Sequence, residues 1–214
     1  MDEEVTIIDS NTRNEKIKKF FINNKKNIII GFSIILVVII GYLSIKEINK
    51  QNKIKLANQF NATTINFKID NKQTTIDQLI ILINKNDTTY SPLALYFLID
   101  NNLIDNKDEI NILFDELINK TSLDQEIKNL IIYKKALFNA DFSTENDLLQ
   151  ILNPLINTDS IWKSHSLYLM AEYFYSKNQK EKAKEFFNQI LLLPDANDDI
   201  RVESQKRLNR DLGE

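Results

Sequence analysis

Residues 28–45 read IIIGFSIILVVIIGYLSI and carry no charged side chain. The uncharged run is bounded by Lys26 and Lys46, and most of its members are Ile, Leu, Val or Phe. At a rise of about 1.5 Å per residue, a helix of this length approaches the hydrocarbon thickness of a bilayer, which is about 30 Å. A helix that is apolar on every side is difficult to bury in a soluble domain. The sequence therefore predicts one transmembrane helix over residues 27–45.

Two other interpretations of this run are weaker. A cleaved signal peptide has an apolar region of about 7 to 15 residues with small residues at its cleavage site. Here the run is longer, and the stretch GYLSIKEI at its end has no A-x-A-like site. A core helix of this size usually keeps one polar face, and this helix has none. We therefore interpret residues 27–45 as an uncleaved single-pass anchor.

The composition argues against several classes of site. The chain has 214 residues, a formal net charge of −3, no cysteine and three glycines. Gly31 and Gly41 lie in the predicted span, and Gly213 lies at the tail. Phosphate-binding loops and the G-x-S-x-G nucleophile elbow need glycine, and a nucleic-acid partner favours a basic surface. We therefore expect no nucleotide or other cofactor, no disulfide, no nucleic acid and no small-molecule substrate.

The charges that flank the span indicate an orientation. Basic residues are more frequent before the span, at Arg13, Lys16, Lys18, Lys19, Lys25 and Lys26, than after it, at Lys46, Lys50, Lys53 and Lys55. By the positive-inside rule, residues 1–26 are predicted to be a cytoplasmic tail and residues 46–214 a periplasmic domain. Among the lysines, Ile17, Phe20 and Phe21 fit an amphipathic turn on lipid headgroups and equally a solvated flank.

Residues 46–214 show helical periodicity throughout, with apolar residues recurring at spacings of three and four. Nine helices are predicted, over residues 46–68, 75–85, 92–104, 108–119, 122–139, 145–157, 161–177, 180–193 and 199–211. We interpret Ser91, before Pro92, as a helix N-cap. Pro194 follows the last turn of another helix. Asn and Asp in the turns, as at Asn178, tolerate left-handed backbone where glycine is missing.

The predicted helices fall into pairs that recur along the chain. Equivalent apolar positions occur at intervals of about 35 residues, at Ile76, Ile110, Leu148 and Ala183. A helical repeat of about this length is the tetratricopeptide pattern. The fold class predicted for the whole chain is therefore all-α, with a single N-terminal transmembrane helix followed by a tetratricopeptide-repeat-like α-solenoid of about four helix pairs and a capping helix.

The last helix pair carries the clearest motif. It contains Ala171-x-x-Phe174 and Ala183-x-x-x-Phe187, with Pro194 near its close. An acidic-to-basic tail, one span, this repeat pattern with Trp162, and a final helix with Arg201 and Arg207 together resemble the bacterial YfgM-like family of ancillary subunits of the SecYEG translocon. The resemblance covers nearly the whole chain. It implies an inner-membrane protein whose periplasmic domain binds translocon subunits or a periplasmic chaperone, and it brings no catalytic motif.

Few residues are candidates for chemistry. His165 is the only histidine, and with no cysteine it cannot form an ordinary structural zinc site. The acidic cluster Asp195, Asn197, Asp198 and Asp199 lacks the central glycine and the final glutamate of a calcium loop, so it is interpreted as a helix cap. No catalytic, cofactor or metal residue is therefore predicted.

An aromatic-rich helix is the best candidate for partner binding. We expect Leu169, Phe174 and Phe187 to lie in the interior, and we name Trp162, Tyr168 and Tyr175 as possible residues of a partner groove.

The predicted function is that of a membrane-anchored protein-binding scaffold, and not of an enzyme. Stacked helix pairs leave a concave face that binds proteins or extended peptides. The anchor raises the effective concentration of the domain near a membrane partner, here the translocon exit. The alternative is a scaffold in cell-envelope assembly or division that recruits envelope proteins through the same groove. A cytosolic import receptor of an organelle also stays open, because the charge asymmetry is small.

Overall fold

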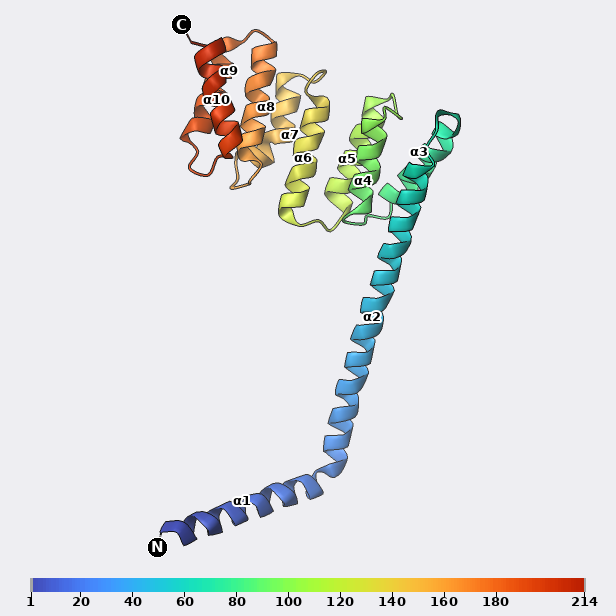
Figure 1. Cartoon of the computed structure of the whole chain (residues 1–214), viewed down its shortest axis with the longest axis vertical. Helices are drawn as coiled ribbons and strands as arrows, with labels where there is room; N and C mark the ends of the chain where they lie inside the picture. Colours follow the sequence, from blue (N-terminus) through green and yellow to red (C-terminus); the bar gives the residue numbers. More distant parts are fainter. Residues whose placement is uncertain (1, 214) are drawn as a thin grey trace. The chain divides into compact units, whose positions relative to one another are not determined.

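The structure is a computed structural model, and it describes residues 2–213. These residues form α-helices, one short 3-10 helix and no strand, which confirms the all-α prediction (Figure 1). The helices are α1 (Asp2–Asn23), α2 (Lys25–Ile65), α3 (Lys72–Ile83), α4 (Tyr90–Asp100), α5 (Lys107–Lys120), α6 (Gln125–Asn139), α7 (Glu145–Ile156), α8 (Lys163–Ser176), α9 (Lys180–Leu192) and α10 (Asp198–Asp211), with the 3-10 helix at Ile69–Asn71. The chain divides into two compact units, Met1–Leu56 and Ala57–Glu214.

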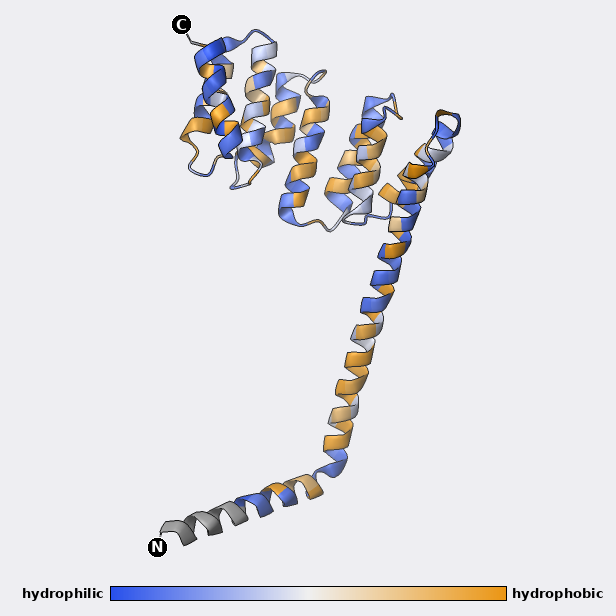
Figure 2. Ribbon diagram, in the orientation of Figure 1, coloured by the Kyte–Doolittle hydropathy of each residue, from blue (hydrophilic) through white to orange (hydrophobic). Residues whose placement is uncertain are grey.

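Helix α2 contains the predicted span. It is the one helix among the described residues that is long and apolar enough to cross a membrane, and no part of its apolar window is buried. The apolar residues form a nearly continuous stretch along it (Figure 2). Phe32 is 68% exposed and Val37 is 67% exposed. This part of the chain therefore has no protein core around it.

The prediction of a separate helix over residues 46–68 is wrong at its start. Helix α2 runs without a break from Lys25 to Ile65, because the chain has neither glycine nor proline between Gly41 and Pro92. Lysine, glutamine and alanine in this polar segment favour a helix, and its asparagines do not interrupt it. Before the span, residues expected to form a short polar tail are helical in α1.

In the second unit, helices α3 to α10 each pack against the next helix in the chain (Figure 1). Helix α8 also contacts α6 and α10. Buried apolar side chains of α6 to α10 form one hydrophobic core. In α7, Leu148, Leu152 and Leu155 are fully buried, and each such side chain contributes about 1.5 to 3 kcal/mol by its removal from water.

The turns follow the predicted chemistry. Asn106 accepts hydrogen bonds from the N–H groups of Asp108 and Glu109, and Thr144 forms a capping box with Asp147. Three asparagines adopt positive φ after helix ends: Asn86, Asn102 and Asn178. Asparagine takes the place of glycine there because its short side chain tolerates left-handed backbone.

The start of α4 differs from the prediction. The helix begins at Tyr90, and Ser91 lies inside it rather than capping it. The Ser91 hydroxyl is buried and donates to the Leu82 carbonyl at 2.8 Å. The carboxylate of Asp87 accepts from the N–H groups of Thr89 and Tyr90 instead. Asp87 therefore satisfies the free N–H groups, and Ser91 links α4 to the end of α3.

Other predicted boundaries shift by a few residues. The helix predicted over 92–104 ends at Asp100, because Asn102 takes positive φ and reverses the chain. The helix predicted over 122–139 starts at Gln125, because the Asp124 side chain caps it by accepting from the Glu126 N–H. The helix predicted over 75–85 covers Lys72–Ile83. Differences of this kind arise at ends, where capping contacts compete with periodicity.

Candidate partner-binding surface

A hollow of about 180 Å³ lies between α4 and α6, with α5 beneath it. Its lining consists of aromatic and aliphatic side chains with one residue of each charge: Tyr96, Ile99, Asp100, Phe114, Lys134, Leu137 and Phe138. Helices α4 and α6 belong to successive predicted pairs, so the hollow lies between two neighbouring repeats of the sequence pattern. A hollow of this size can take one anchor side chain of a protein partner.

The floor of the hollow is aromatic. Phe114 is 1% exposed, and its ring lies 6.0 Å from that of Phe138. Phe138 in turn makes an edge-to-face contact with Phe142 at 5.5 Å, and the Lys107 ammonium lies 3.6 Å from the Phe142 ring centroid. Such aromatic pairs add about 0.5 to 1.5 kcal/mol beyond the area they bury. Phe114 and Phe138 therefore form an aromatic base of the hollow, and Phe142 extends the aromatic contacts beside it.

The rim combines exposed apolar surface with charge. Leu137 is 51% exposed, although it is a large aliphatic residue. The Lys134 ammonium lies 4.7 Å from the ring centroid of Tyr96, and Asp100 lines the same hollow. Burial raises the pKa of Tyr96 to about 12, and the hydroxyl oxygen of Tyr96 is buried without a hydrogen-bond partner among the described residues. An unpaired buried hydroxyl costs about 1 to 3 kcal/mol.

The hollow has no counterpart in the sequence predictions. Tyr96 and Lys134 lie in different predicted pairs, and neither stands out in a local motif. The one available signal is Leu137, an apolar residue outside the buried stripe of α6, whose members include Ile132 and Ala136.

Trp162 lies at the N-terminal end of α8 and contacts α6. Its indole stacks on the Tyr133 ring at 5.6 Å, and its Nε1–H donates to the carbonyl of Glu126 at 3.1 Å. Ser160 beside it donates to the Glu126 carboxylate and accepts from the buried Asn129. Trp162 is therefore half-buried within a polar network that joins α6 to the start of α8.

Tyr168 and Tyr175 contact other elements. Tyr168 makes an edge-to-face contact with Phe187 of α9 at 5.5 Å, and the guanidinium carbon of Arg207 in α10 lies 4.4 Å from the Tyr175 ring centroid. Burial, followed by the Glu172 carboxylate, raises the pKa of Tyr168 to about 12. The three predicted groove residues thus divide between the α6 side and the α9–α10 side of α8, and their contact with a partner stays a prediction.

The predicted interior residues of this region are buried. Leu169, Phe174 and Phe187 are 9%, 1% and 0% exposed, which confirms the prediction for them. His165 is half-buried against the Trp162 and Tyr133 rings, and this burial lowers its pKa. Among residues 2–213, no group of three or more His, Cys, Asp or Glu side chains is placed to hold a metal ion.

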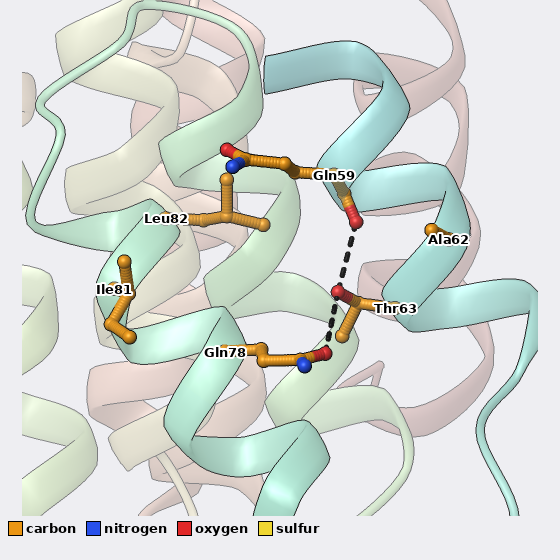
Figure 3. Close-up of a pocket in the computed structure, with 6 residues that line it drawn as sticks. All are labelled: Gln59, Ala62, Thr63, Gln78, Ile81 and Leu82. Carbon is orange, nitrogen blue, oxygen red and sulfur yellow. Dashed lines mark hydrogen bonds between the residues drawn. The ribbon is translucent and has the colours of Figure 1, made fainter. Parts of the chain in front are cut away.

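A second hollow of about 270 Å³ lies between the C-terminal part of α2 and α3 (Figure 3). The Thr63 hydroxyl is hydrogen-bonded to the Gln59 carbonyl at 2.8 Å and to the Gln78 side chain at 3.0 Å. Ile81 is 57% exposed on the opposite wall. This hollow has no aromatic floor and no charged lining residue, so it offers fewer anchoring groups than the hollow between α4 and α6.

Comparisons of this chain with protein-family models, with curated proteins and with solved structures find no match.

Proposed function

We propose that this chain is a single-pass, membrane-anchored scaffold that binds proteins through a tetratricopeptide-repeat-like helical domain. The all-helical fold and the apolar helix α2 support the two parts of this proposal. The pairs would be the C-terminal part of α2 with α3, α4 with α5, α6 with α7 and α8 with α9, with α10 as the capping helix. Helix α8 contacts both α6, the first helix of the preceding pair, and α10, the capping helix that follows. In a stack of helix pairs such contacts are expected, and they support this pairing.

The hollow between α4 and α6 is the observation that carries the binding proposal. Its apolar lining and the half-exposed Leu137 provide a place for an apolar side chain of a partner. Lys134 and Asp100 at the same hollow can contact the carbonyl and N–H groups of an extended peptide. Binding of this kind needs no reacting group, so we propose a binding protein and not an enzyme.

We propose that the partner is a subunit of the Sec translocon or a periplasmic chaperone near it. The support is the resemblance in layout described above, with its basic N-terminal flank, single span and helical repeats. In this proposal the N-terminus is cytoplasmic in a bacterial inner membrane and the helical domain is periplasmic. The anchor then confines the domain to the membrane in which its partner works, which raises their effective concentration.

The test combines topology with partner capture. Protease added to intact spheroplasts should remove the helical domain, and the full-length protein purified in mild detergent should carry translocon or chaperone subunits with it. Protection of the domain from protease would contradict the periplasmic proposal. Co-purification of division or envelope-assembly proteins alone would favour the alternative scaffold role.

A pair of substitutions tests the hollow itself. Leu137→Glu places a charge at the rim, whereas Ile112→Glu makes the same change at a residue of α5 that is 65% exposed and outside the hollow. Loss of an interface anchor costs about 2 kcal/mol or more, so we expect Leu137→Glu to weaken partner capture by about 30-fold. Equal capture by the two variants would exclude this hollow as the binding site.

A further inference from the structure

The C-terminal half of α1 presents an apolar face that no other part of its unit covers. Ile17, Phe20 and Phe21 are 49%, 60% and 56% exposed. Their spacings of three and four residues place them on one side of the helix. The Phe20 and Phe21 rings contact each other edge to face at 6.0 Å. The three residues therefore form a small continuous apolar surface, which we call the α1 face.

Basic residues border the α1 face. Lys16 lies on one side of it and Lys18 on the other, at helical angles that leave the apolar residues between them, whereas Lys19 lies on the far side of the helix. From residue 16 to residue 26 the chain contains no Asp or Glu, and Lys25 and Lys26 follow at its end. Apolar residues flanked by lysine on a helix are typical of a segment that lies in a membrane interface.

The α1 face lies directly before the apolar helix in the chain. Helix α1 ends at Asn23 and α2 begins at Lys25, so a single turn residue separates them. The Asn24 side chain donates to the Phe20 carbonyl at 3.0 Å and its backbone N–H donates to the same oxygen, which closes the end of α1. When α2 crosses a bilayer, the first surface within reach of the α1 face is the leaflet at the N-terminal end of the span.

We propose that residues 13–24 bind the anionic lipid surface of that leaflet. Ile17, Phe20 and Phe21 insert among the acyl chains near the headgroups, and Lys16 and Lys18 at the two edges of the face contact lipid phosphates. The occupant is a phospholipid surface rather than a protein groove, because both the positive charge and the position next to the span match it. This proposal rests on the insertion of α2 proposed above, and it adds a lipid contact outside the span.

The absence of cysteine makes a direct test possible, since any introduced cysteine is unique. Nitroxide labels are attached to the full-length variants Ile17→Cys, Phe21→Cys, Ile22→Cys and Val37→Cys in vesicles of phosphatidylcholine with phosphatidylglycerol. We expect labels at 17, 21 and 37 to be accessible to oxygen and shielded from a water-soluble nickel chelate. Position 22 is the matched control, because Ile22 is apolar but points away from the α1 face.

The outcomes separate the two proposals. Shielding at 37 together with chelate access at 17 and 21 would contradict the proposed lipid contact of the α1 face and would agree with the membrane span. Chelate access at 37 would overturn the span, and the lipid contact with it. Equal shielding at 17, 21 and 22 would show insertion without a face, which also contradicts the proposal.

The charges are tested by two matched double variants. Lys16→Gln and Lys18→Gln together remove the lysines beside the α1 face, and Lys46→Gln and Lys50→Gln remove two lysines after the span. Each lysine near an anionic surface contributes about fivefold, so the first set should lower the ratio of lipid-bound to water-exposed label at 17 by about 25-fold. The second set should leave this ratio unchanged. An equal ratio for wild type and the first set, or an equal loss in both sets, would overturn the role of the lysines.

Discussion

Helices α2 and α7 use the same kinds of apolar residue in opposite ways. In α7 the leucines at 148, 152 and 155 form one stripe, and all three are fully buried by neighbouring helices. In α2 the apolar residues surround the helix, and Ile34 and Val37 are 59% and 67% exposed. A stripe can be covered by another helix, whereas a helix that is apolar on all sides needs an apolar solvent. Periodicity, more than hydrophobicity, therefore separates the part that makes a protein core from the part suited to a bilayer.

The largest effect should come from the core of the second unit. Phe187→Ala removes a ring that is 0% exposed, and such a change typically costs about 3 to 5 kcal/mol. Unfolding in urea can be followed by the fluorescence of Trp162, the single tryptophan, which stacks on Tyr133. Leu192→Ala is the control, because Leu192 is 82% exposed in the same helix and should change stability by less than about 0.5 kcal/mol. Similar losses for the two variants would contradict the core assignment.

A charge in α2 should change membrane insertion and leave the stability of the second unit unchanged. Val37→Arg places a charge at the middle of the apolar stretch, where it costs about 2.5 to 3.5 kcal/mol in a membrane. We expect membrane insertion to fall sharply, as measured by carbonate extraction, and the urea midpoint reported by Trp162 to stay unchanged. Val37→Leu is the matched control. A shift in the urea midpoint would show that this helix stabilises the second unit, which would break the comparison.

A smaller change in the free energy of unfolding is expected at the turn between α8 and α9. Asn178 has φ of 60°, a backbone conformation that costs most residues about 1 to 2 kcal/mol. Asn178→Ala should therefore lower the free energy of unfolding by about 1 kcal/mol, and Asn178→Gly should keep or raise it. Trp162 fluorescence in urea measures both. If the glycine variant loses as much unfolding free energy as the alanine variant, the contacts of the Asn178 side chain, and not its positive φ, stabilise the turn.

Much of the fold could be predicted because its signals are local. The apolar run, the helical periodicity and capping residues such as Asn106 all act within a few residues of the chain, and the predicted helices agree with the structure to within a few residues at most ends. Phe174 and Phe187 follow the stripe of their own helices, so their burial was predictable too. The continuous helix from Lys25 to Ile65 was missed because a change from apolar to polar sequence was interpreted as a boundary, although nothing there breaks a helix.

The candidate binding surface was harder to predict, because it depends on contacts between distant residues. Tyr96 and Lys134 come together only when α4 and α6 are placed beside each other. In the same way, Trp162 is half-buried because Tyr133 of α6 lies against it, and nothing in the sequence around Trp162 indicates that contact. Aromatic composition identified a helix rich in packing residues, but it did not identify which rings stay open to a partner.

The smallest effect we predict is a loss of stability at low pH that arises from ion pairs at the end of α10. Hydrogen bonds from Arg210 and Arg207 lower the pKa of Asp211 to about 2, below its usual value of about 4 in an unfolded chain. Because the pKa is lower in the folded state, the Asp211 carboxylate stabilises the fold above about pH 4, and this contribution is lost as the pH falls through about 2.

We expect Asp211→Asn to be less stable than wild type at neutral pH and to lose less stability on acidification. The urea midpoint measured at neutral pH and near pH 3 tests this, with Asp141→Asn as the control, since Asp141 is exposed and takes part in none of the ion pairs of residues 2–213. If Asp211→Asn responds to acid as wild type does, the ion pairs at the end of α10 do not stabilise the unit.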